Sequence, residues 1–383
     1  MTHRVTRLPL LRAAALLLAV GAPAALRAQG AIGNQGYGYP TGQLSTRTLG
    51  TGGGLAEFDP VSPLNPAALS YIRRATLAFQ YDPEFRRVTA GGTSQNATIA
   101  RFPVLAATLP FRDRYSVGIS ASTYLDRSFV TRYRTTARIG EETVTVDEAV
   151  EARGSIADIR FGVGAYVTRW LRAGVAVHAL TGENRLFSGR TFPDTTRFGS
   201  VGDTSVVDFA GTQLSAGVEL TPIRGVSIAG SARRGLGMRV LSGDSTLRRA
   251  DAPDRIGVGL RVDRVTGATF ALSYARNRWT RLRGLGGPNL DVFDGTDLMG
   301  GVEAVGPRLG ELPLLIRLGA RQRTLPFGLN DTEVRERAFT GVFRSSAGAR
   351  WRTWRSSGRA ARRSRARPPT APGSPTCASA PGR

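Results

Sequence analysis

The chain has 383 residues, a formal net charge of +23 at pH 7 and no Lys, so all 52 basic residues are Arg. Its single Cys, Cys377, excludes a disulfide framework and a thiolate metal site. After removal of a leader, His178 is the only histidine, which leaves little from which to build a histidine metal site or a Ser-His-Asp triad. We therefore expect no metal, no cofactor and no enzymatic activity.

The first 28 residues have the composition of a secretory signal peptide. Three arginines lie near the start, an apolar run follows over 13–22, and small residues ending at Ala28 offer a cleavage site before Gln29. No later stretch has roughly 18 consecutive apolar residues, so we expect no membrane-spanning helix. An exported chain of this kind can enter a membrane only as a β-barrel, because a closed barrel pairs all of its backbone polar groups.

Residues 29–73 precede the regular strands and contain the segment GTGGGLAEFDPVSPLNPAALSYI at 50–72. Its glycines permit close backbone packing and positive φ, while its prolines restrict φ and lack N–H donors. Asn65 is placed to cap a short helix whose first residue is Pro66. The composition suits a compact plug; an ordinary lead-in strand with a turn is the alternative.

From Arg74 onward the chain alternates apolar and small or polar residues with period two, which predicts β-strands. In 115–122, for example, Tyr115, Val117 and Ile119 alternate with Ser, Gly and Ser. We predict twelve strands, at 74–81, 99–110, 115–137, 142–168, 172–187, 205–220, 226–241, 254–264, 268–282, 296–306, 313–324 and 336–343.

The fold class predicted from this pattern is an all-β, transmembrane antiparallel barrel over residues 74–343. Such a barrel directs apolar residues outward to lipid and polar residues inward, whereas a periplasmic sandwich does the reverse. Alternation alone does not separate the two, but the signal peptide and the number of strands favour the barrel. Tyr115, Phe161, Phe270 and Tyr274 are then expected to face lipid.

The predicted connections alternate between short turns and long polar segments, which is typical of an outer-membrane barrel with its short turns in the periplasm. The short connections are 111–114, 169–171, 221–225, 265–267 and 307–312; the long ones are 82–98, 188–204, 242–253, 283–295 and 325–335. This order places 50–72 on the periplasmic side. The gap at 138–141 is an exception, and residues 126–155 form either two long strands or one irregular loop.

Charged residues recur on the Gly/Ser face and are predicted to line the lumen. They are Arg160, Arg233, Arg255, Arg261, Arg317, Arg321, Glu219, Asp263 and Glu303. Either one or two arginines hold a carboxylate by paired hydrogen bonds, or opposite charges pair across the wall and stiffen it. His178 falls on the same face, and we interpret it as a hydrogen-bonding filler.

Residues 344–383 contain ten Arg, five Pro and no acid, and the alternation stops there. The segment is either a disordered basic tail or a stretch translated out of frame in place of a closing hairpin, since GC-rich codons read out of frame give Arg, Ala, Pro and Ser. Because much of the positive charge lies in this tail, and no basic face is found on a folded element, we expect no nucleic-acid binding.

Over 44–72 the sequence resembles the N-terminal signature of the outer-membrane long-chain fatty-acid transporter family. The matching positions are Gly50, Gly52 and Gly53 for the glycines, Asp59 for the acid, and Asn65, Pro66 and Ala67 for the Asn-Pro-Ala motif. The resemblance implies a fourteen-stranded barrel, of which twelve strands are visible here, with this segment as a hatch that gates a ligand. Over 74–342 the resemblance is only architectural.

The same resemblance implies a place in the bacterial outer membrane and passage of a fatty acid or another hydrophobic molecule. Membrane lipid and the barrel-assembly machinery are the other partners expected. Related barrels of protein-secretion systems carry a similar signature, so a structural or secretion-partner barrel without lipid transport is the alternative function.

Overall fold

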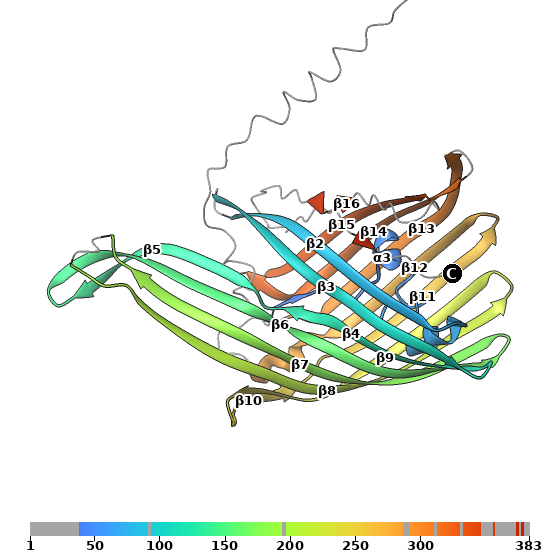
Figure 1. Cartoon of the computed structure of the whole chain (residues 1–383), viewed down its shortest axis with the longest axis horizontal. Coiled ribbons are helices and arrows are strands. Elements are labelled where there is room, and N and C mark those ends of the chain that lie inside the picture. The colour runs from blue at the N-terminus through green and yellow to red at the C-terminus, as the bar shows by residue number, and fades with distance from the viewer. Residues whose placement is uncertain are drawn as a thin grey trace, which may run out of the picture.

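The structure, a computed structural model, describes residues 38–90, 93–193, 197–285, 292–309, 312–329, 332–345, 355–356, 373–374 and 377–378. Sixteen strands of this part form one antiparallel sheet that curves into a barrel (Figure 1). Twelve of them, here called the wall, pair each with the next. They are β2 (Thr76–Ala90), β3 (Thr93–Phe111), β4 (Tyr115–Asp126), β6 (Glu142–Thr168), β7 (Leu171–Thr191), β8 (Val201–Ile223), β9 (Val226–Ser242), β11 (Asp254–Val265), β12 (Ala268–Arg278), β13 (Gly295–Leu309), β14 (Leu312–Leu329) and β15 (Thr332–Ser345).

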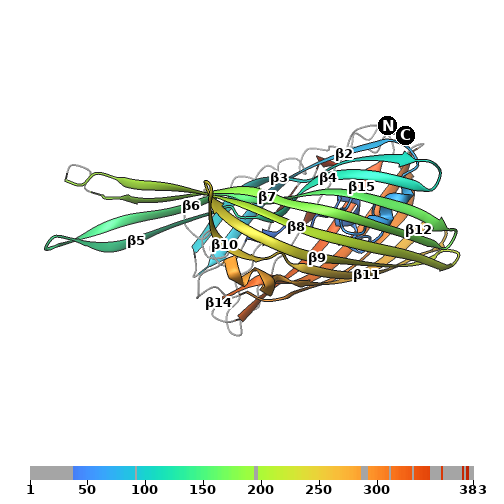
Figure 2. The ribbon, with the colours of Figure 1, turned by 90° about the horizontal axis from the view of Figure 1, so that it is seen from below.

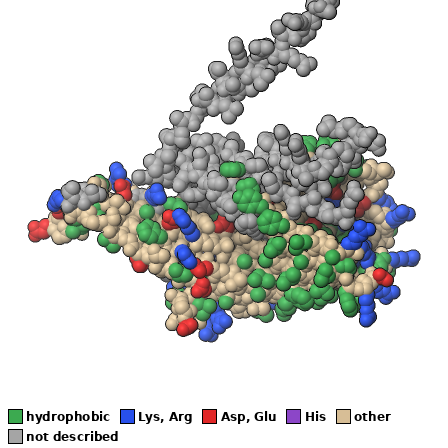
Figure 3. Space-filling model, in the orientation of Figure 1, with side chains coloured by type: hydrophobic (Ala, Val, Ile, Leu, Met, Phe, Trp, Pro, Cys, Tyr) green, Lys and Arg blue, Asp and Glu red, His purple; other side chains and the backbone are tan. Residues whose placement is uncertain are grey.

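Burial along the wall is inverted relative to a soluble protein. On β4, Tyr115 and Ile119 are about half exposed, at 45% and 53%, whereas Ser116 and Ser120, which directly follow them, are buried. Apolar side chains accordingly spread over the outer face (Figure 3). The lumen holds buried polar residues instead, among them Gln213, which is fully buried. This arrangement confirms the predicted all-β barrel with an apolar outer face.

All twelve predicted strands have a counterpart, but the third prediction was too long. Instead of one strand over 115–137, β4 ends at Asp126 and β5 (Phe129–Ile139) begins after a break. β5 pairs with the first half of β6, so 126–155 is not an irregular loop. Because antiparallel pairing satisfies the backbone of both strands, a polar hairpin remains regular outside the apolar band.

Several predicted long connections were also wrong, since they are continuations of wall strands. Strands β7 and β8 remain paired as far as Arg190 and Val201, and β2 and β3 as far as Ala90 and Thr93. β10 (Ser245–Asp251) folds back on β9. With β5 and β6, the extended parts of β7 and β8 project beyond the rest of the wall (Figure 2). We call this the long-loop end and the opposite one the short-turn end.

The order of the wall ends at β15 and β2, which do not pair with each other in the described residues. Cys377 and Ala378 form β18 (Cys377–Ala378), which pairs with Tyr81 and Gln80 of β2. β16 (Arg355–Ser356) pairs with β17 (Gly373–Ser374). The signal peptide predicted at 1–28 and most of the tail predicted at 344–383 lie outside the described residues.

The N-terminal segment lies inside the barrel (Figure 1). It contains β1 (Tyr39–Pro40), α3 (Thr46–Gly50) and η1 (Pro66–Tyr71). Asn65 caps η1 by accepting a 3.0 Å hydrogen bond from the Ala67 amide, as predicted, although η1 is a 3₁₀ helix. A second 3₁₀ helix, η2 (Trp279–Leu285), follows β12. No helix in the described part is long and apolar enough to cross a membrane.

Candidate functional site

Residues 38–72, which we call the hatch segment, occupy the lumen. Their apolar side chains are almost completely buried, as Leu55, Phe58 and Leu69 illustrate with exposures of 2%, 3% and 1%. The helix η1 packs against β4, β6, β7 and β8 near the short-turn end. The lumen is therefore filled by the chain's own N-terminal residues at this level.

Wall glycines make room for the hatch segment. A Cβ added at Gly174 would lie 2.4 Å from the carbonyl carbon of Pro66, and one at Gly319 would lie 2.1 Å from the amide nitrogen of Gly52. A real Cβ atom does not approach a non-bonded atom this closely, so a side chain at these positions would overlap the hatch. The hatch therefore lies directly on the wall backbone. We call these wall positions the glycine belt: Gly118, Gly162, Gly164, Gly174, Gly217, Gly257, Gly259, Gly301 and Gly319.

The glycines of the hatch segment approach the wall equally closely. Gly52 and Gly53 have φ values of +63° and +96°, the left-handed region that favours glycine. A Cβ on Gly53 would lie 2.4 Å from the Sδ atom of Met299, and one on Gly50 would lie 2.9 Å from a methyl carbon of Val342. Conformation and proximity to the wall thus both require glycine at Gly52 and Gly53.

Asp59 and Asn65 organise the hatch segment internally. The Asp59 carboxylate accepts hydrogen bonds from Ser62 Oγ at 2.7 Å, from Thr48 Oγ1 at 2.9 Å and from the Ser45 hydroxyl. Asn65, besides capping η1, donates to the Glu57 carbonyl at 2.9 Å. Both side chains are buried, and their hydrogen bonds are internal to the hatch.

Ion pairs join the hatch segment to the wall. The Arg255 guanidinium donates to Glu57 at 2.6 Å, and Ser231 donates to the same carboxylate at 2.7 Å. On another side of the lumen, Glu303 accepts from Arg47 of the hatch at 2.8 Å and from Arg317 of the wall at 2.5 Å. Two charged positions predicted for the lumen, Arg255 and Glu303, therefore contact the hatch directly.

A third connection centres on Tyr71. Its hydroxyl donates to Glu219 and accepts from Arg261 at 2.9 Å. Burial raises the pKa of Tyr71 to about 12, so the phenol keeps its proton at neutral pH and acts as the donor. Arg261 also pairs with Asp263 at 2.9 Å. Glu219 and Arg261, both predicted for the lumen, thus hold the last residue of η1.

The remaining predicted lumen arginines differ from these. Arg321 pairs with Asp297 of the neighbouring wall strand at 3.3 Å. Arg160 is 2% exposed, and neither its Nε nor its Nη1 atom has a hydrogen-bond partner among the described residues. Arg160 is therefore a buried cation with free donor capacity.

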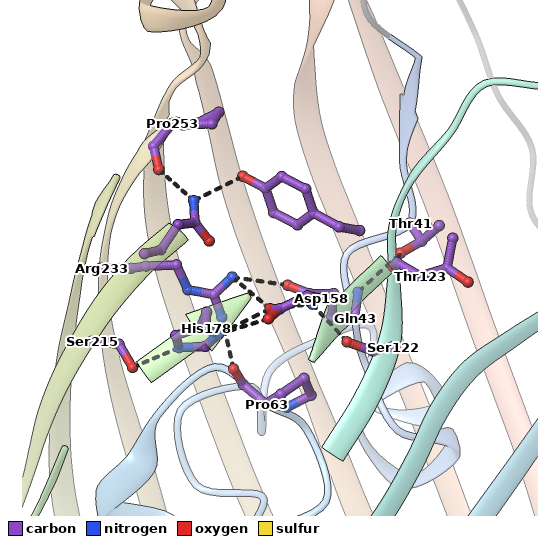
Figure 4. Close-up of polar contacts among 12 residues, drawn as sticks. Thr41, Gln43, Pro63, Ser122, Thr123, Asp158, His178, Ser215, Arg233 and Pro253 are labelled. Carbon is purple, nitrogen blue, oxygen red and sulfur yellow. Dashed lines mark hydrogen bonds and ion pairs between the residues drawn. The ribbon is translucent and has the colours of Figure 1, made fainter. Parts of the chain in front are cut away.

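A polar network that the sequence did not reveal surrounds His178 (Figure 4). His178 contacts Asp158 through Nδ1 and Ser215 through Nε2, each at 2.8 Å. Gln43 of the hatch donates to Asp158 at 2.8 Å, and Arg233 donates to Asp158 at 3.2 Å. We call these five residues the polar network.

Ser215, His178 and Asp158 have the connectivity of a hydrolytic triad, but Asp158 and Arg233 of the network also hold the hatch. Arg233 donates to the Pro63 carbonyl at 2.7 Å and to the Gln43 amide oxygen at 3.1 Å. The adjoining cavity measures about 50 Å³, room for little more than water. The geometry favours a structural role, in agreement with the filler interpretation of His178.

Sequence reasoning missed Gln43, Glu57 and Tyr71, the hatch partners of the charged wall residues. The available signal was their polarity within an otherwise apolar segment, because a buried polar side chain requires a partner. Their partners could not have been identified, since they lie on strands more than a hundred residues away.

Above the polar network, toward the long-loop end, the lumen contains an apolar cluster. Tyr124 and Trp279 lie within it, with ring centroids 5.6 Å apart. The other members are Leu125, Ile156, Leu180, Phe209, Met238, Val240, Ala252, Leu282 and Val292. From η1 toward the long-loop end, the lumen therefore contains the polar network and then this apolar cluster, and the start of the hatch segment reaches the level of the cluster, where Pro40 pairs with Leu125.

No protein-family model and no curated protein matches the chain. Solved structures do. A Pseudomonas aeruginosa FadL homologue is 11% identical with a TM-score of 0.53, over 89% of this chain and 97% of its own. The Ralstonia pickettii toluene transporter TbuX is 15% identical (TM-score 0.53; 87% and 96% covered), and the Pseudomonas putida toluene transporter TodX is 14% identical (0.53; 89% and 97%).

At these identities the comparisons establish the fold. The chain shares the whole architecture of these proteins, since nearly the full length of each is covered. Together with its apolar outer face, this fold places the chain among bacterial outer-membrane β-barrels.

Proposed function

We propose that the chain is an outer-membrane channel for hydrophobic compounds and that residues 38–72 are its hatch. The observation that carries the proposal is the placement of this segment in the lumen on a belt of wall glycines. Besides this close packing, side-chain hydrogen bonds and ion pairs hold it to the wall, and these can break without unfolding the barrel. The shared fold with two toluene transporters supports the same class of cargo.

The apolar cluster supports a hydrophobic rather than a polar cargo. A compound that arrives at the long-loop end meets Tyr124, Trp279 and their apolar neighbours, with Arg127 stacked on the ring of Phe209 beside them. Displacing apolar side chains with an apolar ligand costs little, whereas a polar solute would lose its hydration there.

Within this class, a fatty acid fits the lumen better than an uncharged hydrocarbon. Ile156 of the apolar cluster and Arg160 lie four residues apart on β6, about 13 Å along the strand. An acyl chain in the apolar layer can thus present its carboxylate to the free Nε and Nη1 donors of Arg160. Arg160 is the proposed carboxylate contact, and hatch displacement is the proposed gate.

The proposal is tested by binding of tritiated oleate and toluene to the purified full-length barrel in detergent. Wild-type protein should bind both, and Arg160→Gln should weaken oleate binding at least tenfold while leaving toluene binding unchanged. Arg185→Gln, on the exposed part of β7, is the matched control. Absence of binding of either compound, with another protein retained through purification, would favour the partner-barrel alternative.

A further inference from the structure

A large cavity opens on the outer face of the wall. It measures about 780 Å³, within the range of ligand sites in proteins. The outward-facing residues that line it include Phe161, Val175, Val177, Leu214 and Ile256, which are 45–61% exposed and form the floor of a groove. Its other end has Arg234, Arg276, Arg278 and Asp254, and it is also bordered by Arg233 and Arg255, whose side chains donate to Asp158 and Glu57 in the lumen.

The register of the wall explains the shape of the groove. One row of directly paired residues runs from Phe161 through Val177 and Leu214 to Arg234. A second row beside it consists of Val163, Val175, Ala216, Ala232, Ile256 and Arg276. Since neighbouring strands are about 4.8 Å apart, the second row spans about 24 Å across six strands.

Both rows change from apolar to cationic residues in the same direction across the wall. On β6, β7 and β8 every member is apolar, and each row ends at an arginine, on β9 or β12. The groove therefore has an apolar half and a cationic half, the polarity of an amphiphile. A groove for an uncharged chain would need no arginine at the same end of both rows.

The cationic half lies toward the long-loop end. Arg278 is the last residue of β12 and lies opposite Asp254, the first residue of β11, in the backbone register of the two strands. Within the described part of the chain Arg278 makes no ion pair, Arg276 approaches Asp294 only to 3.8 Å, and Arg234 pairs with Asp254 at 2.8 Å. The cationic half thus retains unneutralised positive charge at the edge of the apolar band.

We propose that this groove binds a membrane lipid with a phosphorylated headgroup. The acyl chain lies on β6, β7 and β8, and the phosphate is held by Arg276 and Arg278. The inference rests on the membrane location in the proposed function but not on transport. The wall separates the groove from the lumen, because the side chains of Ser215 and Arg233 on the same strands point inward to His178 and Asp158.

Native mass spectrometry of the purified full-length barrel tests the proposal, with dioleoyl phosphatidylglycerol and dioleoyl phosphatidylcholine as probes. The anionic lipid should be retained preferentially. Arg276→Gln with Arg278→Gln should weaken its binding about thirtyfold, the effect of removing two interfacial cations. Glycerol phosphate, which has the charge without the chains, should not compete at equal concentration.

The double variant Arg224→Gln, Arg264→Gln is the matched control, since both arginines are exposed at the short-turn end of adjacent strands. Equal loss of the anionic lipid in both double variants, or equal retention of the two lipids by wild type, would overturn the groove proposal. Placing Asn at Val175 and Val177 tests the apolar half and should weaken both lipids alike. If the wild-type protein binds neither oleate nor toluene but still prefers the anionic lipid, the channel proposal is overturned and the groove proposal stands.

Discussion

The guanidinium of Arg255 on β11 donates a 2.6 Å hydrogen bond to the carboxylate of Glu57 in the hatch segment. Glu57 is fully buried, so this pair is screened from water and its strength depends on both partners being present. The contact joins two segments that are 198 residues apart in the sequence. Closing the lumen is therefore coupled to the side chains of individual wall strands.

Removal of Glu57 should open the lumen. Glu57→Ala leaves the largely buried Arg255 with Ser231 but without its carboxylate partner, and breaking a buried ion pair costs about 3–5 kcal/mol at most. The hatch is the element that can move, so we expect frequent conducting events in planar bilayers where wild type is closed. Glu183→Ala, which breaks an exposed pair with Arg185, should remain as quiet as wild type.

A methyl group in the glycine belt should have a similar effect through sterics. Gly174→Ala places a carbon 2.4 Å from the Pro66 carbonyl carbon, so η1 must shift or the wall must deform. We expect increased conductance and faster proteolysis of the hatch segment, with the barrel still heat-modifiable in electrophoresis. Gly237→Ala is the control, because no atom lies within 4 Å of its added Cβ. Identical proteolysis of the two variants would contradict a close hatch–wall fit.

The cap of η1 makes a smaller contribution. Asn65→Ala removes the hydrogen bond to the Ala67 amide and the one to the Glu57 carbonyl. Loss of an N-cap typically costs about 1 kcal/mol, so the hatch should loosen by roughly fivefold in its opening equilibrium. Amide hydrogen exchange over 65–72 measures this directly. Asn65→Asp, which retains a capping oxygen, should recover part of the protection.

The stability of the closed hatch is expected to fall at high pH because of Tyr71. Because the folded-state pKa is raised to about 12 from about 10, the contribution of the protonated phenol is complete below pH 10 and is lost as the pH rises toward 12. We expect a late phase in an absorbance titration at 295 nm, and Tyr71→Phe to reduce the amplitude of that phase by the contribution of one tyrosine. A wild-type titration without a late phase would show that Tyr71 is not buried against Glu219.

The sequence predicted those parts of the fold that local patterns determine. Period two located all twelve wall strands, and the Asn65–Pro66 pair located the start of η1. The break after Asp126 was not predicted, because alternation continues across it in residues 129–139. Partners such as Asp158 for Gln43 could not be predicted, since they depend on the path of the hatch through the lumen.

The same limit applies to the glycines of the wall. Their position on the polar face was visible in the sequence, but its reason was not, because an empty lumen would be satisfied equally by serine. Only the proximity of Gly217 to the Asn65 side chain, and of Gly257 to Glu57, shows that the missing side chains leave space for another segment.

Because of the glycine belt, the inner wall is sterically complementary to this particular hatch segment. Substitutions in the hatch and at the nine belt positions cannot be tolerated independently, since each side occupies space that the other leaves. A chimera that receives residues 38–72 from a different barrel of this fold should close only if the belt is transplanted from the same donor. The hatch segment and the glycine belt are therefore expected to evolve together.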